Sequence, residues 1–456
     1  MGVLGGCALP MAVACGPQVT PYVYDPDAHD DSSSSGDEPD PGTSVTLGTT
    51  MGGETTEPTT AESTGAPSTI CGDAQLDQGE ECDDGNLELA DGCEDDCRFS
   101  PGTILWSRSI DGGAASNDFA TSLAIGSTGF IHVTGGIEDG ATANAWLGVL
   151  DSNGELLEEV VFDVGHDEIA NSVVLDESNT VWVIGQDLDD DRALLLQLDG
   201  EAFVQVGMGG AHELPFPTRG VAARGGGLFT SRQESDEAGW SYAIDLRDAR
   251  GTPIWTAQDV GNALVSAMVA TPEGGVVLAG QIENESGHAQ VWLRELDSEG
   301  STLWTYAEDF VDYEDESLTT VIFSTNGTLL AGGQQEIPGF GYVPFIAELD
   351  RTGALVDLRD VTVGEASFWL YGLVDDGEGL VVGGAAYPDN TPSDAVVAAL
   401  DDAGAVRWGA SYDDALGFND SARAIARLPL THDVIAVGTD VATGEGDNIW
   451  VARIRG

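Results

Sequence analysis

The 456-residue sequence contains no lysine, so its 16 basic residues are all arginine. Against them stand 79 aspartates and glutamates, which gives a formal net charge of −63 and an isoelectric point near 4.1. Binding to nucleic acid needs clustered basic side chains, so this shortage excludes a nucleic-acid partner. It also disfavours adsorption to an anionic membrane surface, and we expect membrane contact only through a lipid anchor.

Long apolar runs are also missing, and no stretch reaches the roughly 18 to 20 residues of a membrane-spanning helix. Residues 1–15 are apolar and uncharged like the core of a secretory signal, with Ala12 and Ala14 forming an A-x-A cleavage pattern. The same segment resembles a loose bacterial lipobox, which predicts lipidation of Cys15. The alternative is simple secretion with Cys15 free or in a disulfide. Both place the protein outside the cytoplasm, as an outer-membrane or cell-surface lipoprotein or as a secreted protein.

Cysteine is scarce and clustered. After the signal cysteines Cys7 and Cys15, the remaining four are Cys71, Cys82, Cys93 and Cys97. Four cysteines in an oxidising compartment predict two disulfides, and three connectivities stay open. The spacing has one tight pair and no histidine nearby, which does not indicate zinc.

Two short regions precede the main part of the chain. Residues 16–70 consist of Ser, Thr, Pro, Gly and acidic residues without an apolar period, so they predict a disordered stalk. Residues 71–98 read CGDAQLDQGEECDDGNLELADGCEDDCR and resemble the myxobacterial cysteine-rich repeat of secreted proteins. So short a module has little core, and disulfides must hold it.

Oxygen-bearing side chains crowd this module beside turn-forming glycines. Calcium takes six to eight oxygen ligands, so we predict a calcium site from Asp83, Asp84, Asn86 and Asp91. The alternative is a solvated acidic loop without an ion. No other cofactor is expected.

Residues 103–456 contain an internal repeat of about 50 residues. One unit reads QVWLRELDSEGSTLW, and its equivalent aliphatic positions are Leu150, Leu198, Leu246, Leu296, Leu349, Leu400 and Ile454. Unit four shows four short strands, at 264–271, 275–281, 291–296 and 302–307, separated by Gly- and Asp-containing turns. Seven such units predict an all-β, seven-bladed β-propeller. The first Trp-type strand, 103–109, would complete the last blade and close the ring.

The repeats resemble bacterial secreted propeller repeats of the L-D-x-x-G-x-x-x-W type, a resemblance that implies the fold and no activity. Periodic tryptophans such as Trp106, Trp255, Trp304 and Trp408 predict packing between blades rather than a sugar platform. No H-E-x-x-H or G-x-S-x-G motif is present, the histidines are scattered, and no residue is identified as catalytic.

These features predict a non-catalytic cell-surface or periplasmic lipoprotein that binds a protein or glycan through its propeller face, with calcium as a candidate cofactor. One alternative is an extracytoplasmic polysaccharide lyase or hydrolase with its site at the propeller mouth. Another is a structural component of the envelope.

Calorimetric titration of calcium into the purified protein tests the predicted metal site. Saturable heat and a higher melting temperature than in chelator are expected, because an ion that binds only the folded state stabilises it. No heat and no shift would contradict the calcium site and leave the acidity as an adaptation to a saline habitat.

Overall fold

A computed structural model describes residues 71–456 except for 114–116, 139, 141, 164, 190–191, 200–201, 206–218, 237–238, 261–262, 311–314, 338–340, 365–366, 388–392, 413–418 and 443–445. The predicted signal segment 1–15 with Cys15 and the predicted stalk 16–70 lie outside the described residues. The described part of the chain holds no helix that is long and apolar enough to cross a membrane.

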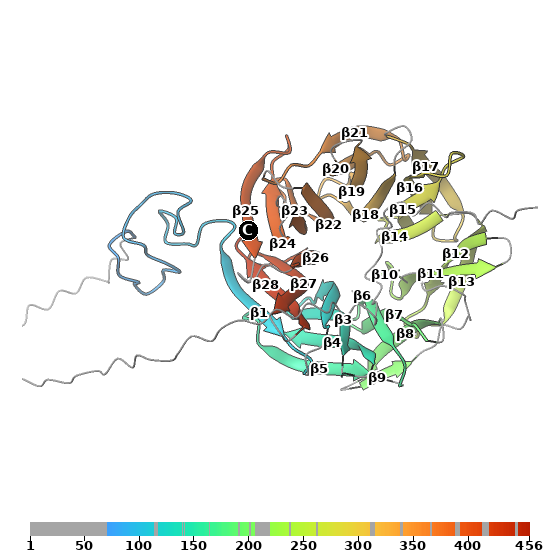
Figure 1. Ribbon diagram of the computed structural model, residues 1–456, viewed down its shortest axis with the longest axis horizontal. Helices are drawn as coiled ribbons and strands as arrows, with labels where there is room; N and C mark the ends of the chain where they lie inside the picture. The colour runs from blue at the N-terminus through green and yellow to red at the C-terminus, as the bar shows by residue number, and fades with distance from the viewer. Residues whose placement is uncertain are drawn as a thin grey trace, which may run out of the picture.

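Seven four-stranded antiparallel sheets form a ring of blades, which confirms the predicted all-β, seven-bladed propeller (Figure 1). From the ring axis outward, the first blade has β2 (Phe119–Ile125), β3 (Ile131–Glu138), β4 (Ala143–Leu150) and β5 (Leu156–Phe162). The second has β6 (Glu168–Leu175), β7 (Val181–Asp187), β8 (Arg192–Asp199) and β9 (Ala202–Gln205). The third has β10 (Arg219–Ala222), β11 (Leu228–Asp236), β12 (Gly239–Arg247) and β13 (Pro253–Val260).

The remaining blades follow the same order. The fourth has β14 (Ala263–Ala270), β15 (Val276–Glu283), β16 (Ala289–Leu296) and β17 (Thr302–Glu308), where four strands were predicted. The fifth has β18 (Glu316–Phe323), β19 (Leu329–Ile337), β20 (Gly341–Leu349) and β21 (Leu355–Asp360). The sixth has β22 (Ser367–Asp375), β23 (Leu380–Tyr387), β24 (Asp394–Leu400) and β25 (Val406–Tyr412). The seventh has β26 (Ser421–Arg427), β27 (Val434–Ala442), β28 (Gly446–Ile454) and, outermost, β1 (Ile104–Ile110).

The ring is closed by its first and last strands. β1 pairs antiparallel with β28, from Ile104 opposite Ile454 to Ile110 opposite Ile449, as the incomplete seventh repeat predicted. This pairing gives the last blade its fourth strand and covers the edge of β28 that would otherwise be open.

The blades pack face to face, so their middle strands are buried on both sides. All eight residues of β4 are buried, whereas the outermost strand β21 is almost fully exposed. Such burial explains why the middle strands read as continuous apolar runs rather than alternating ones. Each core cluster joins neighbouring blades, as where Val277 and Leu293 of the fourth blade pack with Phe345 of the fifth.

The L-D-x-x-G motif forms the turn between the third and fourth strands of a blade. In the turn after β20, Asp350 Oδ1 accepts hydrogen bonds from the backbone N–H groups of Thr352 (2.8 Å) and Ala354 (3.0 Å). Gly353 adopts φ +78°, a left-handed conformation that favours glycine. The same two acceptor bonds recur at the other turns of this type, at Asp151, Asp248, Asp297 and Asp401.

The tryptophan of the motif packs against the next blade, as predicted. A Cβ atom built on Gly353 would lie 2.4 Å from the Trp304 ring of the preceding blade. The pairs Trp106–Gly154 and Trp255–Gly300 repeat this contact elsewhere in the ring. The glycine therefore serves both the turn and the approach of the neighbouring indole.

The cysteine-rich segment lies outside the ring, next to β1 (Figure 1, blue). Its disulfides are Cys71–Cys97 and Cys82–Cys93, one of the three connectivities that the sequence left open. An ion pair between Glu81 and Arg455 (3.0 Å) joins the segment to the end of the propeller.

Replacing Gly353 and Gly404 by alanine separates the two roles of the motif glycine. Gly404 has nearly the same φ, +81°, but nothing lies within 4 Å of its added Cβ. We expect Gly404→Ala to lose about 1 to 2 kcal/mol through the left-handed conformation. Gly353→Ala should lose roughly 1 to 3 kcal/mol more, because the methyl group overlaps Trp304. Urea and thermal denaturation measure both variants, and equal losses would contradict the blade-to-blade contact.

Candidate functional site: the axial channel

The innermost strands of the blades share a local irregularity. In six of them the register with the second strand shifts by one residue, which leaves one extra residue in a β-bulge. The bulged residues are Thr121, Asn171, Ser266, Thr319, Tyr371 and Arg423. All six line one channel along the ring axis.

The second strand of each of these blades carries a glycine opposite the bulge. A Cβ atom on Gly438 would lie 1.7 Å from Ser421 O, and one on Gly280 would lie 1.8 Å from Leu264 O. A larger residue would therefore collide with the bulged strand. In the third blade the register of β10 and β11 places Arg232 at this position, and no shift occurs within β10. The third blade thus departs from the repeat at the channel wall.

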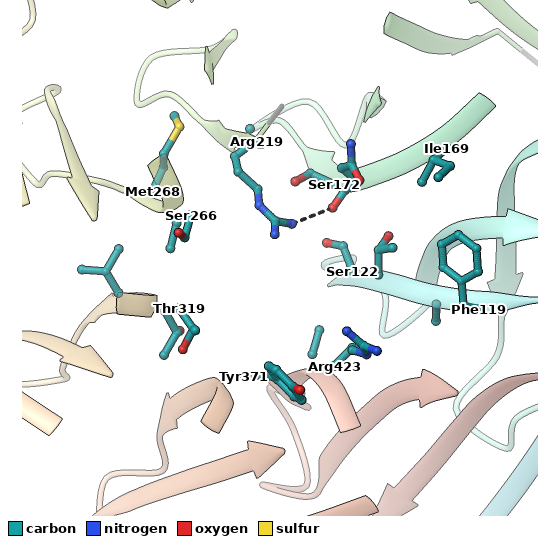
Figure 2. Close-up of a pocket in the computed structure, with 18 of the residues that line it drawn as sticks. Phe119, Ser122, Ile169, Ser172, Arg219, Ser266, Met268, Thr319, Tyr371 and Arg423 are labelled. Atoms are coloured by element: carbon teal, nitrogen blue, oxygen red, sulfur yellow. Dashed lines mark hydrogen bonds between the residues drawn. The ribbon is translucent and has the colours of Figure 1, made fainter. Parts of the chain in front are cut away.

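The channel has a volume of about 280 Å³ and is lined from all seven blades. Figure 2 shows Ser122, Ser266, Thr319, Tyr371 and the two arginines, Arg219 and Arg423, around its open space. Its polar lining consists of hydroxyls, one asparagine and these arginines, and no aspartate, glutamate, histidine or cysteine occurs among the described lining residues. The chain is strongly acidic, but this channel is not.

Arg219 reaches from β10 toward the middle of the channel (Figure 2). Its Nη1 donates a hydrogen bond to Asn171 O at 3.1 Å. Its Nε is enclosed and has no hydrogen-bond partner among the described residues. Burial lowers the pKa of Arg219 to about 10, so the guanidinium stays charged at neutral pH.

Arg423 lies across the channel on β26. Its Nε donates to Ser421 Oγ at 3.0 Å, and its guanidinium carbon lies 5.2 Å from the centre of the Tyr371 ring. Burial raises the pKa of Tyr371 to about 12, although Arg423 opposes the shift. The phenol is therefore neutral at physiological pH.

An acidic cluster lies beyond Arg423, between the seventh and first blades. Burial raises the pKa of Asp447 to about 6, with Arg423 opposing the shift and Asp118 and Glu138 adding to it. Asp118 is fully buried and its carboxylate accepts the N–H groups of Gly112 (2.6 Å) and Glu138 (2.8 Å). Burial raises the pKa of Asp118 as well, against these hydrogen bonds. The cluster is not part of the channel lining.

The residues predicted to hold calcium are only partly brought together. Asn86 Nδ2 donates to Asp91 Oδ2 at 3.1 Å. Asp84 Oδ1 accepts the backbone N–H of Asn86. Asp83 faces the backbone instead and accepts the N–H groups of Asp73, Ala74 and Gly85. Burial raises the pKa of Asp83, but these hydrogen bonds outweigh it and the net pKa is lowered. The calcium site stays a prediction.

Two further groups place possible metal-ligand atoms within 4.8 Å of one another. One joins Glu80, Asp83 and Cys97, but the sulfur of Cys97 is committed to its disulfide with Cys71. The other joins His166, Glu168 and Asp187, with His166 Nδ1 at 3.3 Å from Asp187 Oδ2. In the sequence the histidines are scattered, and His166 and Glu168 meet Asp187 only through the pairing of β6 with β7.

Sequence reasoning missed the channel residues Arg219 and Arg423. Their signal is an exception to the repeat, because the bulge column otherwise holds Thr121, Asn171, Ser266, Thr319 and Tyr371. Arg219 aligns with Ser172 by the pairing of their strands with β11 and β7. Arg423 is the charged residue of the bulge column, and Arg219 is a charged residue at the next position, where the second blade has Ser172.

No model of a known protein family matches the sequence, and no curated protein matches it either. Solved structures with a similar fold exist. A Dyadobacter fermentans protein of unknown function is 11% identical with a TM-score of 0.47, over 78% of this chain and 99% of that one. Sqt1 from Chaetomium thermophilum is 13% identical with a TM-score of 0.46, over 78% and 98% of the two chains. Domains 1–2 of Drosophila semaphorin 1a are 10% identical with a TM-score of 0.46, over 77% and 88%. At these identities the likeness is one of fold alone.

The shifted pKa of Asp447 predicts a specific pH dependence. The pKa of about 6 means that the folded protein holds this proton well above the ordinary aspartate pKa of 3.8. The folded state therefore binds more protons between these values, and stability falls as the pH rises through this window. Asp447→Asn removes the penalty, so its melting temperature relative to wild type should rise from pH 4 to pH 6 and then level off.

Asp350→Asn is the control of opposite sign. The Thr352 hydroxyl, followed by the N–H groups of Ala354 and Thr352, lowers the pKa of Asp350. Its stabilising contribution is thus present at neutral pH and is lost as the pH falls through the lowered value. Melting curves from pH 3 to 7 compare the two variants, and a constant offset for Asp447→Asn would contradict its raised pKa.

Proposed function

We propose that the protein is an extracytoplasmic binding scaffold that recognises its partner through the axial channel of the propeller. The supporting observation is the channel itself, a cavity of about 280 Å³ whose polar lining comes from all seven inner strands. Concave sites with a few convergent polar groups are the usual form of a ligand site.

The composition of the channel favours binding over hydrolysis. A glycosidase needs two carboxyl groups across the scissile bond, and none lies in the described lining. Ser122, Ser172 and Ser266 have hydroxyls there, but a serine nucleophile needs an adjacent base such as histidine. Arginine, hydroxyl and amide groups suit recognition by hydrogen bonds.

The cellular placement follows from the N-terminal region. Two disulfides are consistent with an extracytoplasmic location, because such bonds persist in oxidising compartments. We propose further that Cys15 is lipidated and that residues 16–70 hold the propeller away from the membrane surface. A protein or a glycan at the cell surface would then reach the channel.

A test of this function uses the labelled full chain on arrays of glycans and peptides. We expect saturable binding to a defined subset of probes without cleavage of the bound probes. Ser266→Phe places an aromatic ring in the channel and should abolish that binding. Thr302→Phe is the matched control, because Thr302 lies exposed on the outermost strand β17.

Three results would contradict this proposed function. Cleaved probes would contradict a binding scaffold and identify an extracytoplasmic enzyme. Binding that Ser266→Phe leaves intact, in a variant that retains the wild-type circular dichroism, would place recognition outside the channel. No binding at all would favour a structural role in the envelope.

A further inference from the structure

Two arginines, Arg219 and Arg423, line the channel of a protein whose net charge is −63. The described channel lining contains no carboxylate, and the only carboxylate that acts on either arginine in the part of the chain described is Asp447, outside the lining, whose raised pKa Arg423 opposes. Several arginines elsewhere are paired with carboxylates, as where Arg453 and Arg455 approach Asp433 at 2.6 and 3.6 Å. Removing a charge from water is unfavourable unless an opposite charge or hydrogen bonds compensate it. The channel is therefore short of negative charge.

The polar groups left without partners in the channel are donors. Arg219 uses Nη1 on Asn171 O, but its enclosed Nε makes no hydrogen bond within the described chain. Asn171 is 4% exposed, and its Nδ2 likewise lacks a partner among the residues described. A guanidinium and an amide NH₂ can only donate. Their natural complement is a group that offers several acceptor oxygens.

Two of the other bulge residues, both threonines, do not offer their hydroxyl hydrogens to such a ligand. Thr121 Oγ1 donates to Ala170 O at 2.6 Å, and Thr319 Oγ1 donates to Leu370 O at 2.7 Å. These bonds tie each inner strand to the next blade and leave the threonines occupied. These threonines have a structural role in the ring, which distinguishes them from Arg219, Arg423 and Asn171.

The chemistry and the size of the channel define the ligand class. Guanidinium groups bind carboxylate, sulfate and phosphate oxygens through paired N–H groups, and the bond gains from the opposite charges. Drug-sized ligands occupy pockets of about 300 to 1,000 Å³, so this channel of about 280 Å³ takes a small group. A polyanionic chain or a folded domain would not enter.

We propose that the axial channel binds a single oxyanion group, a carboxylate, sulfate or phosphate, between Arg219 and Arg423 with Asn171 as a further donor. This inference rests on the proposed binding function and names its ligand class. The group belongs either to a free small anion or to the acidic end of a larger partner. Surface acids repel free anions at a distance, so binding is best measured near 0.15 M salt, where the screening length is about 8 Å.

The experiment measures calorimetric binding and thermal shifts of the full chain with sulfate, phosphate, N-acetylglutamate and a peptide ending in glutamate. Sodium chloride at equal ionic strength is the reference, and glucose is the neutral probe. We expect saturable binding of at least one oxyanion probe and none of glucose. Arg219→Gln should weaken that binding roughly tenfold or more, since it removes a charge-assisted hydrogen bond.

Arg351→Gln is the matched control, because it removes one arginine from an exposed turn where Arg351 pairs with Glu273. It should leave the affinity unchanged. Arg423→Gln is a second channel variant, which keeps the test decisive if Arg219→Gln fails to fold by circular dichroism. Binding of sulfate or phosphate identifies a free anion, whereas binding of the peptide alone identifies an acidic group on a partner, and both support the inference.

Three results would overturn it. Oxyanion binding that neither arginine variant weakens would place the anion elsewhere on the surface. Glucose or another neutral probe that binds in a Ser266-dependent manner, while no oxyanion binds, would refute the anion site but keep the proposed function. If Ser266→Phe abolishes the binding of no probe, both the anion site and the proposed binding function are contradicted.

Discussion

The pairing of β1 with β28 is the contact on which the rest of the molecule depends. No blade forms a hydrophobic core by itself, because every core cluster of the described residues combines side chains of neighbouring blades. The cluster that joins the seventh blade to the first includes Ile131 and Trp146 of the first with Val451 of the seventh. Trp450 Nε1 also donates to Ser107 Oγ at 3.0 Å across the closing strands. Opening this pairing would expose two sheet edges and separate the walls of the channel.

The channel is a consequence of how the blades are built. Each bulge turns one side chain toward the axis, and a glycine on the neighbouring strand makes room for it. Most blades use this position for a short polar side chain, and two such threonines hydrogen-bond to the next blade. The third blade lacks the opposing glycine, and the seventh places Arg423 at its bulge. Arg219 thus lies on the blade that lacks the bulge, whereas Arg423 lies on a blade that keeps both the bulge and the opposing Gly438.

Much of the fold could be predicted from the sequence, because the same pattern of four strands recurs seven times. The period gave the number of blades, the L-D-x-x-G turns marked the outer hairpins, and the displaced strand at 103–109 predicted the closure. The Trp304–Gly353 contact also follows from that motif.

The disulfide connectivity could not be predicted, since Cys71 and Cys82 each had several partners within reach. The channel was missed because Arg219 and Arg423 lie about 200 residues apart and meet only when the ring closes. The many acidic residues also suggested metal ligands. The carboxylates of Asp151, Asp350 and others, however, accept hydrogen bonds from backbone N–H groups of their own turns.

We propose a closed seven-bladed ring that holds an oxyanion between two arginines on its axis. The most direct measurement is an anomalous difference map from a crystal of the full chain soaked in selenate, whose selenium marks the position of a bound oxyanion. We expect a selenium peak in the channel closed by β1 and β28, placed so that the selenate oxygens lie within hydrogen-bond distance of the Arg219 guanidinium. A map with selenium peaks only on the outer surface, or with none, would contradict it.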